Sequence, residues 1–132
     1  MAESKPTLGQ VGWIDLTVDD APAIRDFYCQ IAGWQWTPVA MDGYEDFCVG
    51  PDRESPVAGI CHRRGLNAGV PPQWLIYISV ADLDRSQSEC LRLGGRIIGP
   101  PREMGAYGTL CIVEDPAGAV VALIQPLSQA KS

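Results

Sequence analysis

The chain has 132 residues, 46% of them hydrophobic, and carries 16 acidic against 10 basic side chains, a formal net charge of −6. This length is typical of one domain with its own core. Nucleic-acid phosphates are bound by clustered basic side chains, whereas the basic residues here are scattered apart from the neighbours Arg63 and Arg64. We therefore expect no nucleic-acid partner. The acidic balance is what solubility requires and favours a cationic ligand only modestly.

The sequence shows no features of a membrane or secreted protein. No apolar run approaches the ~18 residues of a membrane span. The first ten residues lack the basic start and apolar run of a secretory signal. Five cysteines, an odd number without a C-x-x-C pair, are typical of reduced thiols in a core. The sequence thus predicts a cytoplasmic protein with no membrane partner.

The first elements along the chain are a strand and a helix. Residues 11–18 alternate between apolar and polar types and predict a strand, and Asp20 is placed to cap the helix that follows. Gly33 is a typical helix stop. The helix has an apolar stripe at i, i+3, i+4 and i+7, formed by Ile24, Phe27, Tyr28 and Ile31. We assign Phe27 and Tyr28 to core packing.

The same order of elements then occurs twice. Strands are predicted at 34–40, 44–50 and 57–63, and the Gly- and Pro-rich residues 65–72 form a linker. The second half predicts a strand at 74–80, a helix from Asp82 to Leu93, and strands at 96–98, 108–114 and 119–125. The chain is therefore expected to form one domain over residues 1–132, made of two βαβββ modules at about 11–64 and 73–126.

The two modules are related by an internal repeat. Residues 12–20 align with 74–82 at a shift of 62, and with one extra residue Cys48 aligns with Cys111 and Val57 with Val120. Duplicated units of this kind bury their apolar faces against each other. The repeat therefore predicts a site between the two halves.

Two motifs carry a resemblance to a known family. The helix sequence Asp-Asp-Ala-Pro-Ala-Ile-Arg-Asp-Phe-Tyr at residues 19–28, continuing to Gly33-Trp34, precedes a late Glu-Asp-Pro-Ala-Gly-Ala turn at residues 114–119. Over about residues 11–126 the chain resembles the vicinal oxygen chelate superfamily, which includes glyoxalase I, extradiol dioxygenases and bleomycin-binding proteins. It looks most like the glyoxalase-like subgroup. The resemblance implies an α+β fold in which the two modules form a cup-shaped, mixed eight-stranded sheet.

The resemblance also implies where a metal would be held. Family enzymes bind a divalent ion through His or Glu side chains of the first and last strands of each module. These positions correspond here to Trp13, Gly59, Leu75 and Ala122, and none of these side chains can ligate a metal. The chain's one histidine, His62, lies three residues beyond Gly59, which places it on the opposite strand face. We therefore expect no metal and no other cofactor.

Strand alternation then predicts what lines the cup. Parity with Trp13 places Asp15 on the same face, and the repeat adds Tyr77 to that face. Tyr107 lies between two glycines and is predicted to close the mouth. The predicted ligand-binding residues are Trp13, Asp15, Cys61, Tyr77, Tyr107 and Ala122. The alternative for the two aromatic residues Trp13 and Tyr77 is that they fill a closed core.

Asp15 is the candidate catalytic residue. A carboxylate among apolar side chains is desolvated, which favours proton transfer unless a cation or several N–H donors hold it ionised. Asp15 is therefore predicted to be the polar anchor or the general acid/base of the cup. The alternative is a structural aspartate that accepts hydrogen bonds from the backbone or pairs with an arginine.

Three functions remain open at this stage. The leading hypothesis is a metal-independent protein that binds a small organic ligand, as the bleomycin-binding proteins do. The second is a glyoxalase-like lyase or isomerase, or a dioxygenase-type enzyme, acting on a small organic substrate. The third is a metalloenzyme that uses His62 with Glu45 or Glu114. The resemblance also implies a homodimer, for which Trp34 and Trp36 offer an apolar interface.

Overall fold

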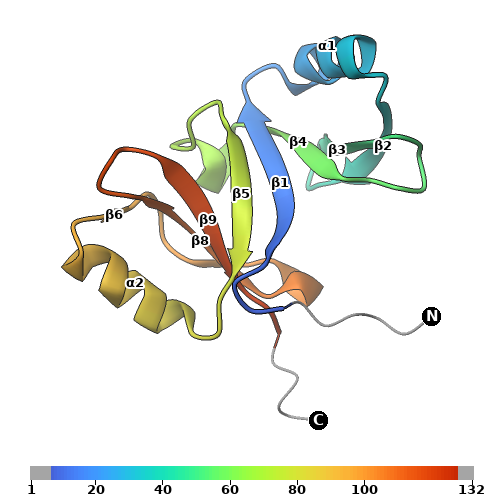
Figure 1. The fold of residues 1–132 in the computed structure, drawn as a ribbon. Coiled ribbons are helices and arrows are strands. Elements are labelled where there is room, and N and C mark those ends of the chain that lie inside the picture. The colour runs from blue at the N-terminus through green and yellow to red at the C-terminus, as the bar shows by residue number, and fades with distance from the viewer. Residues whose placement is uncertain (1–6, 128–132) are drawn as a thin grey trace. The chain divides into compact units, whose positions relative to one another are not determined.

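The computed structural model describes residues 7–127. The chain separates into two compact units, one formed by Trp13–Leu75 and the other by Met1–Gly12 with Ile76–Ser132. Figure 1 shows the helices and strands of both. None of the helices in the described part of the chain is long and apolar enough to span a membrane.

The Trp13–Leu75 unit contains one helix against four paired strands. Its elements are β1 (Val11–Val18), α1 (Ala21–Ala32), β2 (Gln35–Ala40), β3 (Glu45–Gly50), β4 (Ala58–His62) and the 3₁₀ turn η1 (Gly65–Asn67). The strand order is β2-β3-β4-β1. β1 and β4 run parallel, and the other neighbours are antiparallel. This is the predicted βαβββ module.

The Ile76–Ser132 unit repeats this arrangement. Its elements are β5 (Trp74–Ser79, which begins in the other unit), α2 (Leu83–Arg92), β6 (Arg96–Ile97), β7 (Arg102–Glu103), the 3₁₀ turn η2 (Gly105–Tyr107), β8 (Thr109–Glu114) and β9 (Val120–Gln125). The order is β5-β9-β8-β6, with β7 on β8. The α+β fold is confirmed. β7 brings the strands among the described residues to nine, because Arg102 pairs with Leu110 and Glu103 with Thr109.

The helix ends lie where the sequence predicts them. Asp20 caps α1, its Oδ1 accepting a hydrogen bond from the Ala23 N–H at 3.2 Å. Asp82 caps α2 in the same way through the Arg85 N–H at 3.1 Å. Gly33 follows α1 with a φ of 72°, the left-handed conformation that glycine adopts without strain. These caps satisfy backbone groups that a helix end otherwise leaves unpaired.

The apolar stripe of α1 is only partly buried. Ile24 and Tyr28 pack on the core of the Trp13–Leu75 unit, as do Trp34 and Trp36. Phe27 is 52% exposed, so its assignment to the core is wrong. Residues four apart lie nearly above one another on a helix, so Ile24 and Tyr28 both face the strands. Phe27 precedes Tyr28 and is rotated from it by about 100° around the helix axis, toward solvent. The two tryptophans are partly buried against this core, and a dimer interface through them stays a prediction.

The internal repeat is visible in the strand register. Asp15 pairs with Gly59 in the first unit, and Tyr77 pairs with Ala122 in the second, which matches shifts of 62 and 63. The repeat slips by one residue at β3 and β8. Cys48 is opposite Gly59, whereas Cys111 is opposite Leu123 and packs on the α2 side. The aligned cysteines therefore lie on different faces of their strands.

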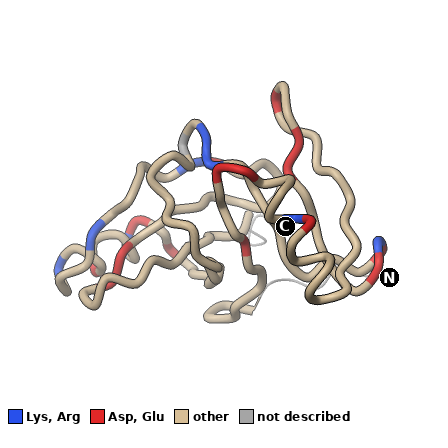
Figure 2. The backbone as a smooth tube through the Cα atoms, turned by 90° about the horizontal axis from the view of Figure 1, so that it is seen from above, with Lys and Arg blue, Asp and Glu red and all other residues tan. Residues whose placement is uncertain are grey.

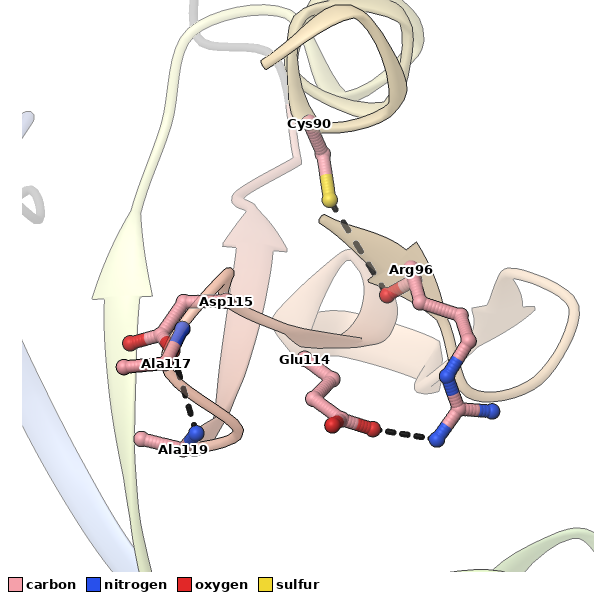
Figure 3. Close-up of polar contacts among 6 residues, drawn as sticks. All are labelled: Cys90, Arg96, Glu114, Asp115, Ala117 and Ala119. Carbon is pink, nitrogen blue, oxygen red and sulfur yellow. Dashed lines mark hydrogen bonds and ion pairs between the residues drawn. The ribbon is translucent and has the colours of Figure 1, made fainter. Parts of the chain in front are cut away.

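The Asp-Pro-Ala-Gly turn after β8 is held by its own side chain (Figure 3). Asp115 Oδ1 accepts hydrogen bonds from the backbone N–H groups of Ala117, at 2.8 Å, and Ala119, at 3.0 Å. Beside it, Arg96 on β6 forms an ion pair with Glu114 at the end of β8. The motif that carries the family resemblance thus ends one strand and starts the next.

The substitution Gly108→Ala should destabilise the protein severely. Gly108 has a φ of +113°, and a Cβ there would lie 2.1 Å from the carbonyl oxygen of Gln125. Backbone strain and the clash together should cost at least about 2 kcal/mol of unfolding free energy, measured by urea denaturation. Gly99→Ala is the matched control, because a Cβ at Gly99 meets no atom within 4 Å. Equal stabilities of the two variants would contradict the prediction.

Candidate functional site

The candidate site lies on the strand face of the Trp13–Leu75 unit that faces away from α1. Ile14, Leu16 and Val18 of β1 pack with residues of α1 in the core. Successive residues of a strand point to opposite faces, so Trp13 and Asp15 lie on the other face. The predicted parity of β1 agrees with this packing.

Trp13, Asp15 and Gly59 are in direct contact on this face. Trp13 Nε1 donates a hydrogen bond to Asp15 Oδ1 at 2.6 Å. A Cβ on Gly59 would lie 2.2 Å from that oxygen and 3.5 Å from Trp13 Nε1. The Asp15 carboxylate therefore occupies the space that a side chain at position 59 would fill. The sequence predicted the shared face but not the indole–carboxylate hydrogen bond.

Cys61 lies on the same face and is held as a neutral thiol. Burial raises the pKa of the Cys61 thiol far above its ordinary value, and the nearby carboxylates of Asp15 and Asp46 raise it further. Burial, followed by the charge of Asp15, also raises the pKa of Cys48. A protonated thiol is a weak nucleophile and a weak hydrogen-bond donor. Cys61 is therefore suited to contacting a ligand and poorly suited to attacking one.

His62 has a different partner from those predicted. Its Nδ1 lies 3.1 Å from Asp46 Oδ1, and its ring contacts that of Phe47, a core residue on the α1 side. The predicted partners were Glu45 and Glu114. Glu114 forms an ion pair with Arg96, and His62 pairs with Asp46, the residue after Glu45. Among the described residues, no three or more His, Cys, Asp or Glu side chains are grouped as metal ligands would be.

The four positions at which the resemblance places metal ligands do not fit a metal. Trp13 donates its N–H to Asp15, and Gly59 lies under that carboxylate. Leu75 is 1% exposed, Ala122 is fully buried, and both side chains are apolar. A divalent ion needs several carboxylate, imidazole or thiolate donors that converge on one point. Asp15 is not one of these positions, but it is the register partner of Gly59 in the parallel β1–β4 pair.

Three predicted ligand-binding residues belong to the Ile76–Ser132 unit. Tyr77 on β5 is half-buried and pairs directly with Ala122 on β9. Tyr107 ends η2 and is 76% exposed. The structure thus brings Tyr77 and Ala122 together and leaves Tyr107 at the surface. That Tyr107 closes over a ligand stays a prediction.

Acidic and basic residues are mixed along the described chain (Figure 2). Arg63, next to the site in sequence, donates to the Val70 carbonyl at 3.0 Å and forms an ion pair with Asp19 at 3.1 Å. Arg63 thereby ties the segment after β4 to the turn before α1.

Gly59→Ala should be destabilising only while Asp15 is present. The new Cβ displaces the carboxylate and breaks its hydrogen bond with Trp13, which should cost about 1–2 kcal/mol of unfolding free energy. In an Asp15→Ala background the same change should cost almost nothing, so a double-mutant cycle should give a coupling of about 1 kcal/mol. Gly12→Ala, where a Cβ meets nothing within 4 Å, is the control. Additive effects would show that the two residues do not contact.

Comparison with known proteins places this chain in a family. The family described as Glyoxalase/Bleomycin resistance protein/Dioxygenase superfamily matches residues 10–123. A Mycobacterium tuberculosis protein named "Putative glyoxylase CFP32" is 31% identical over 119 residues, which are 89% of this chain and 46% of that protein. The Anthracycline biosynthesis protein DnrV of Streptomyces peucetius is 29% identical over 126 residues, 94% of this chain and 44% of DnrV. The chain thus spans about half the length of these relatives.

Solved structures show the same fold at low sequence identity. Methylmalonyl-CoA epimerase from Mycobacterium tuberculosis superposes with a TM-score of 0.55 at 16% identity, over 97% of this chain and 96% of that one. The Streptomyces coelicolor methylmalonyl-CoA epimerase gives 0.56 at 14% identity, over 92% of this chain and all of the other. The chain belongs to the Glyoxalase/Bleomycin resistance protein/Dioxygenase superfamily.

Proposed function

We propose that this chain binds a small organic molecule without a resident metal, on the strand face that carries Trp13, Asp15 and Cys61. The observation that carries the proposal is the contact over Gly59. Where the resemblance places a metal ligand there is no side chain, and the Asp15 carboxylate fills the space. A carboxylate paired with an indole N–H is a hydrogen-bonding site, not a metal centre.

The chemistry of this face indicates what the ligand offers. A carboxylate has about four lone-pair sites, so Asp15 can accept a hydrogen bond from a ligand in addition to the one from Trp13. The Trp13 ring provides a flat apolar surface for stacking, and the neutral Cys61 thiol adds a weak donor. The expected ligand is therefore flat and apolar, with an O–H or N–H donor that reaches Asp15.

The second candidate is an enzyme that uses Asp15 as a general acid or base. The name of the Mycobacterium tuberculosis relative, which refers to a glyoxylase, favours a reaction of this kind. We further propose that Tyr77, Tyr107 and Ala122 contribute to ligand binding. The proposal also includes a cytoplasmic location and a homodimer. Turnover that survives a chelator and is lost with Asp15→Ala would favour the enzyme over the binding protein.

Metal analysis tests the absence of a resident ion. Purified protein should contain far less than one divalent ion per chain, and EDTA should leave its melting temperature unchanged. An ion that bound only the native state at 100 times its dissociation constant would add about 2.7 kcal/mol of stability, so its removal would be easily seen. Stoichiometric metal, or a large loss of stability in EDTA, would contradict the proposal.

A screen of small flat organic compounds by thermal shift tests the ligand site. A compound that raises the melting temperature of the wild type should lose most of its effect with Asp15→Asn, because the amide removes the negative charge and one acceptor oxygen. The loss should correspond to about 1.5–3 kcal/mol of binding free energy. Asp42→Asn, in an exposed turn, is the matched control and should bind as the wild type. Unchanged binding by Asp15→Asn would remove this residue from the site.

A further inference from the structure

The pair formed by Asp46 and His62 borders the proposed ligand site, because the Asp46 carboxylate also acts on the Cys61 thiol, but His62 is not one of that site's residues. Asp46 Oδ1 accepts a hydrogen bond from the His62 backbone N–H at 2.9 Å and lies 3.1 Å from His62 Nδ1. Asp46 is only 6% exposed. An ionised carboxylate can only accept hydrogen bonds, so the hydrogen of a neutral His62 ring must be on Nδ1. The contact therefore sets the tautomer of the imidazole.

The opposite ring nitrogen is left as a hydrogen-bond acceptor. With the hydrogen on Nδ1, the lone pair of a neutral imidazole is on Nε2. The His62 side chain is 22% exposed, so the ring is not sealed in the core. Its orientation is restrained by two aromatic rings: Tyr44, edge-on at 5.5 Å and 83°, and Phe47 at 6.1 Å. A carboxylate on one nitrogen and rings on its sides fix the imidazole as in acid–base dyads.

Two arginines contact these rings. The Arg64 guanidinium lies over the Tyr44 ring at 3.8 Å, and that of Arg25 lies over Phe47 at 4.6 Å. The titratable and charged groups that these contacts place around the ring are Asp46, Tyr44, the neutral Cys61 preceding His62 on β4, and the two arginines. Each arginine contacts an aromatic ring that also contacts the imidazole.

We propose that His62 is a proton-transfer site for a weakly acidic organic hydroxyl, an enol or a phenol. The hydroxyl donates to Nε2, and its proton passes to that nitrogen while the O–H electron pair stays on oxygen. The products are an imidazolium and an oxyanion, and return of the proton restores both. Asp46 is a positioning residue that holds the tautomer and stabilises the imidazolium. The proposal does not depend on the Trp13–Asp15 site and would survive its failure.

Nitrogen NMR tests the tautomer directly, because His62 is the chain's only histidine. At a pH where the ring of uniformly ¹⁵N-labelled wild type is neutral, the ring should show the Nδ1–H tautomer. Asp46→Asn should shift the population toward Nε2–H, since asparagine can donate to Nδ1. Circular dichroism confirms whether this variant folds. A neutral wild-type ring with its hydrogen on Nε2 would overturn the proposal without any variant.

The probe for the hydroxyl is 4-nitrophenol, whose visible absorbance distinguishes phenol from phenolate. Titration with the probe should move the Nε2 resonance, and millimolar wild-type protein should increase the phenolate absorbance. His62→Gln should reduce this increase at least tenfold, and Asp42→Asn, in an exposed turn, should leave it unchanged. An Nε2 resonance that stays fixed under excess probe, or an equal increase with His62→Gln, would overturn the proposal. A loss with Asp15→Asn alone would assign the phenol to the Trp13–Asp15 site instead and would equally overturn it.

Discussion

The parallel pairing of β1 with β4 is the constraint on which the candidate site depends. It sets Asp15 opposite Gly59, and the missing side chain on Gly59 makes room for the carboxylate. The indole N–H of Trp13 then satisfies one oxygen of that carboxylate at 2.6 Å. A buried carboxylate without such donors would be costly, because desolvation penalises the charge. Gly59 thus leaves the space for the Asp15 carboxylate, and Trp13 supplies its hydrogen bond.

The neighbouring polar groups follow from the same low-dielectric surroundings. Burial and two carboxylates keep the Cys61 thiol protonated, as its strongly raised pKa shows. The buried Asp46 carboxylate is satisfied instead by His62, which contacts it through both its backbone N–H and its ring Nδ1. If the antiparallel register continued, Asp46 would stand across from Cys61, one residue beyond the last β3–β4 pair, Phe47 and Ile60. Its side chain thus replaces a strand partner for the His62 N–H.

Much of the fold could be predicted because it is encoded locally. Helix caps at Asp20 and Asp82 and the stop at Gly33 are interactions within a few residues, which a sequence pattern records directly. The repeat predicted the equivalent registers of β1–β4 and β5–β9. It failed at β3 and β8, where the aligned cysteines lie on different faces. Identity of residue type does not guarantee equal strand register, since a slip of one residue changes the face.

The sequence by itself determined the order of elements, the family, and the residue types at the positions of the family's metal ligands. These depend on periodicity, caps and motifs that are contiguous in the chain. Only the tertiary structure decided which side chains meet. His62 contacts Asp46, 16 residues away, instead of Glu45 or Glu114, and Phe27 faces solvent beside a partly buried Tyr28. Such contacts depend on how strands end and how a helix is rotated on them, which single-chain periodicity does not specify.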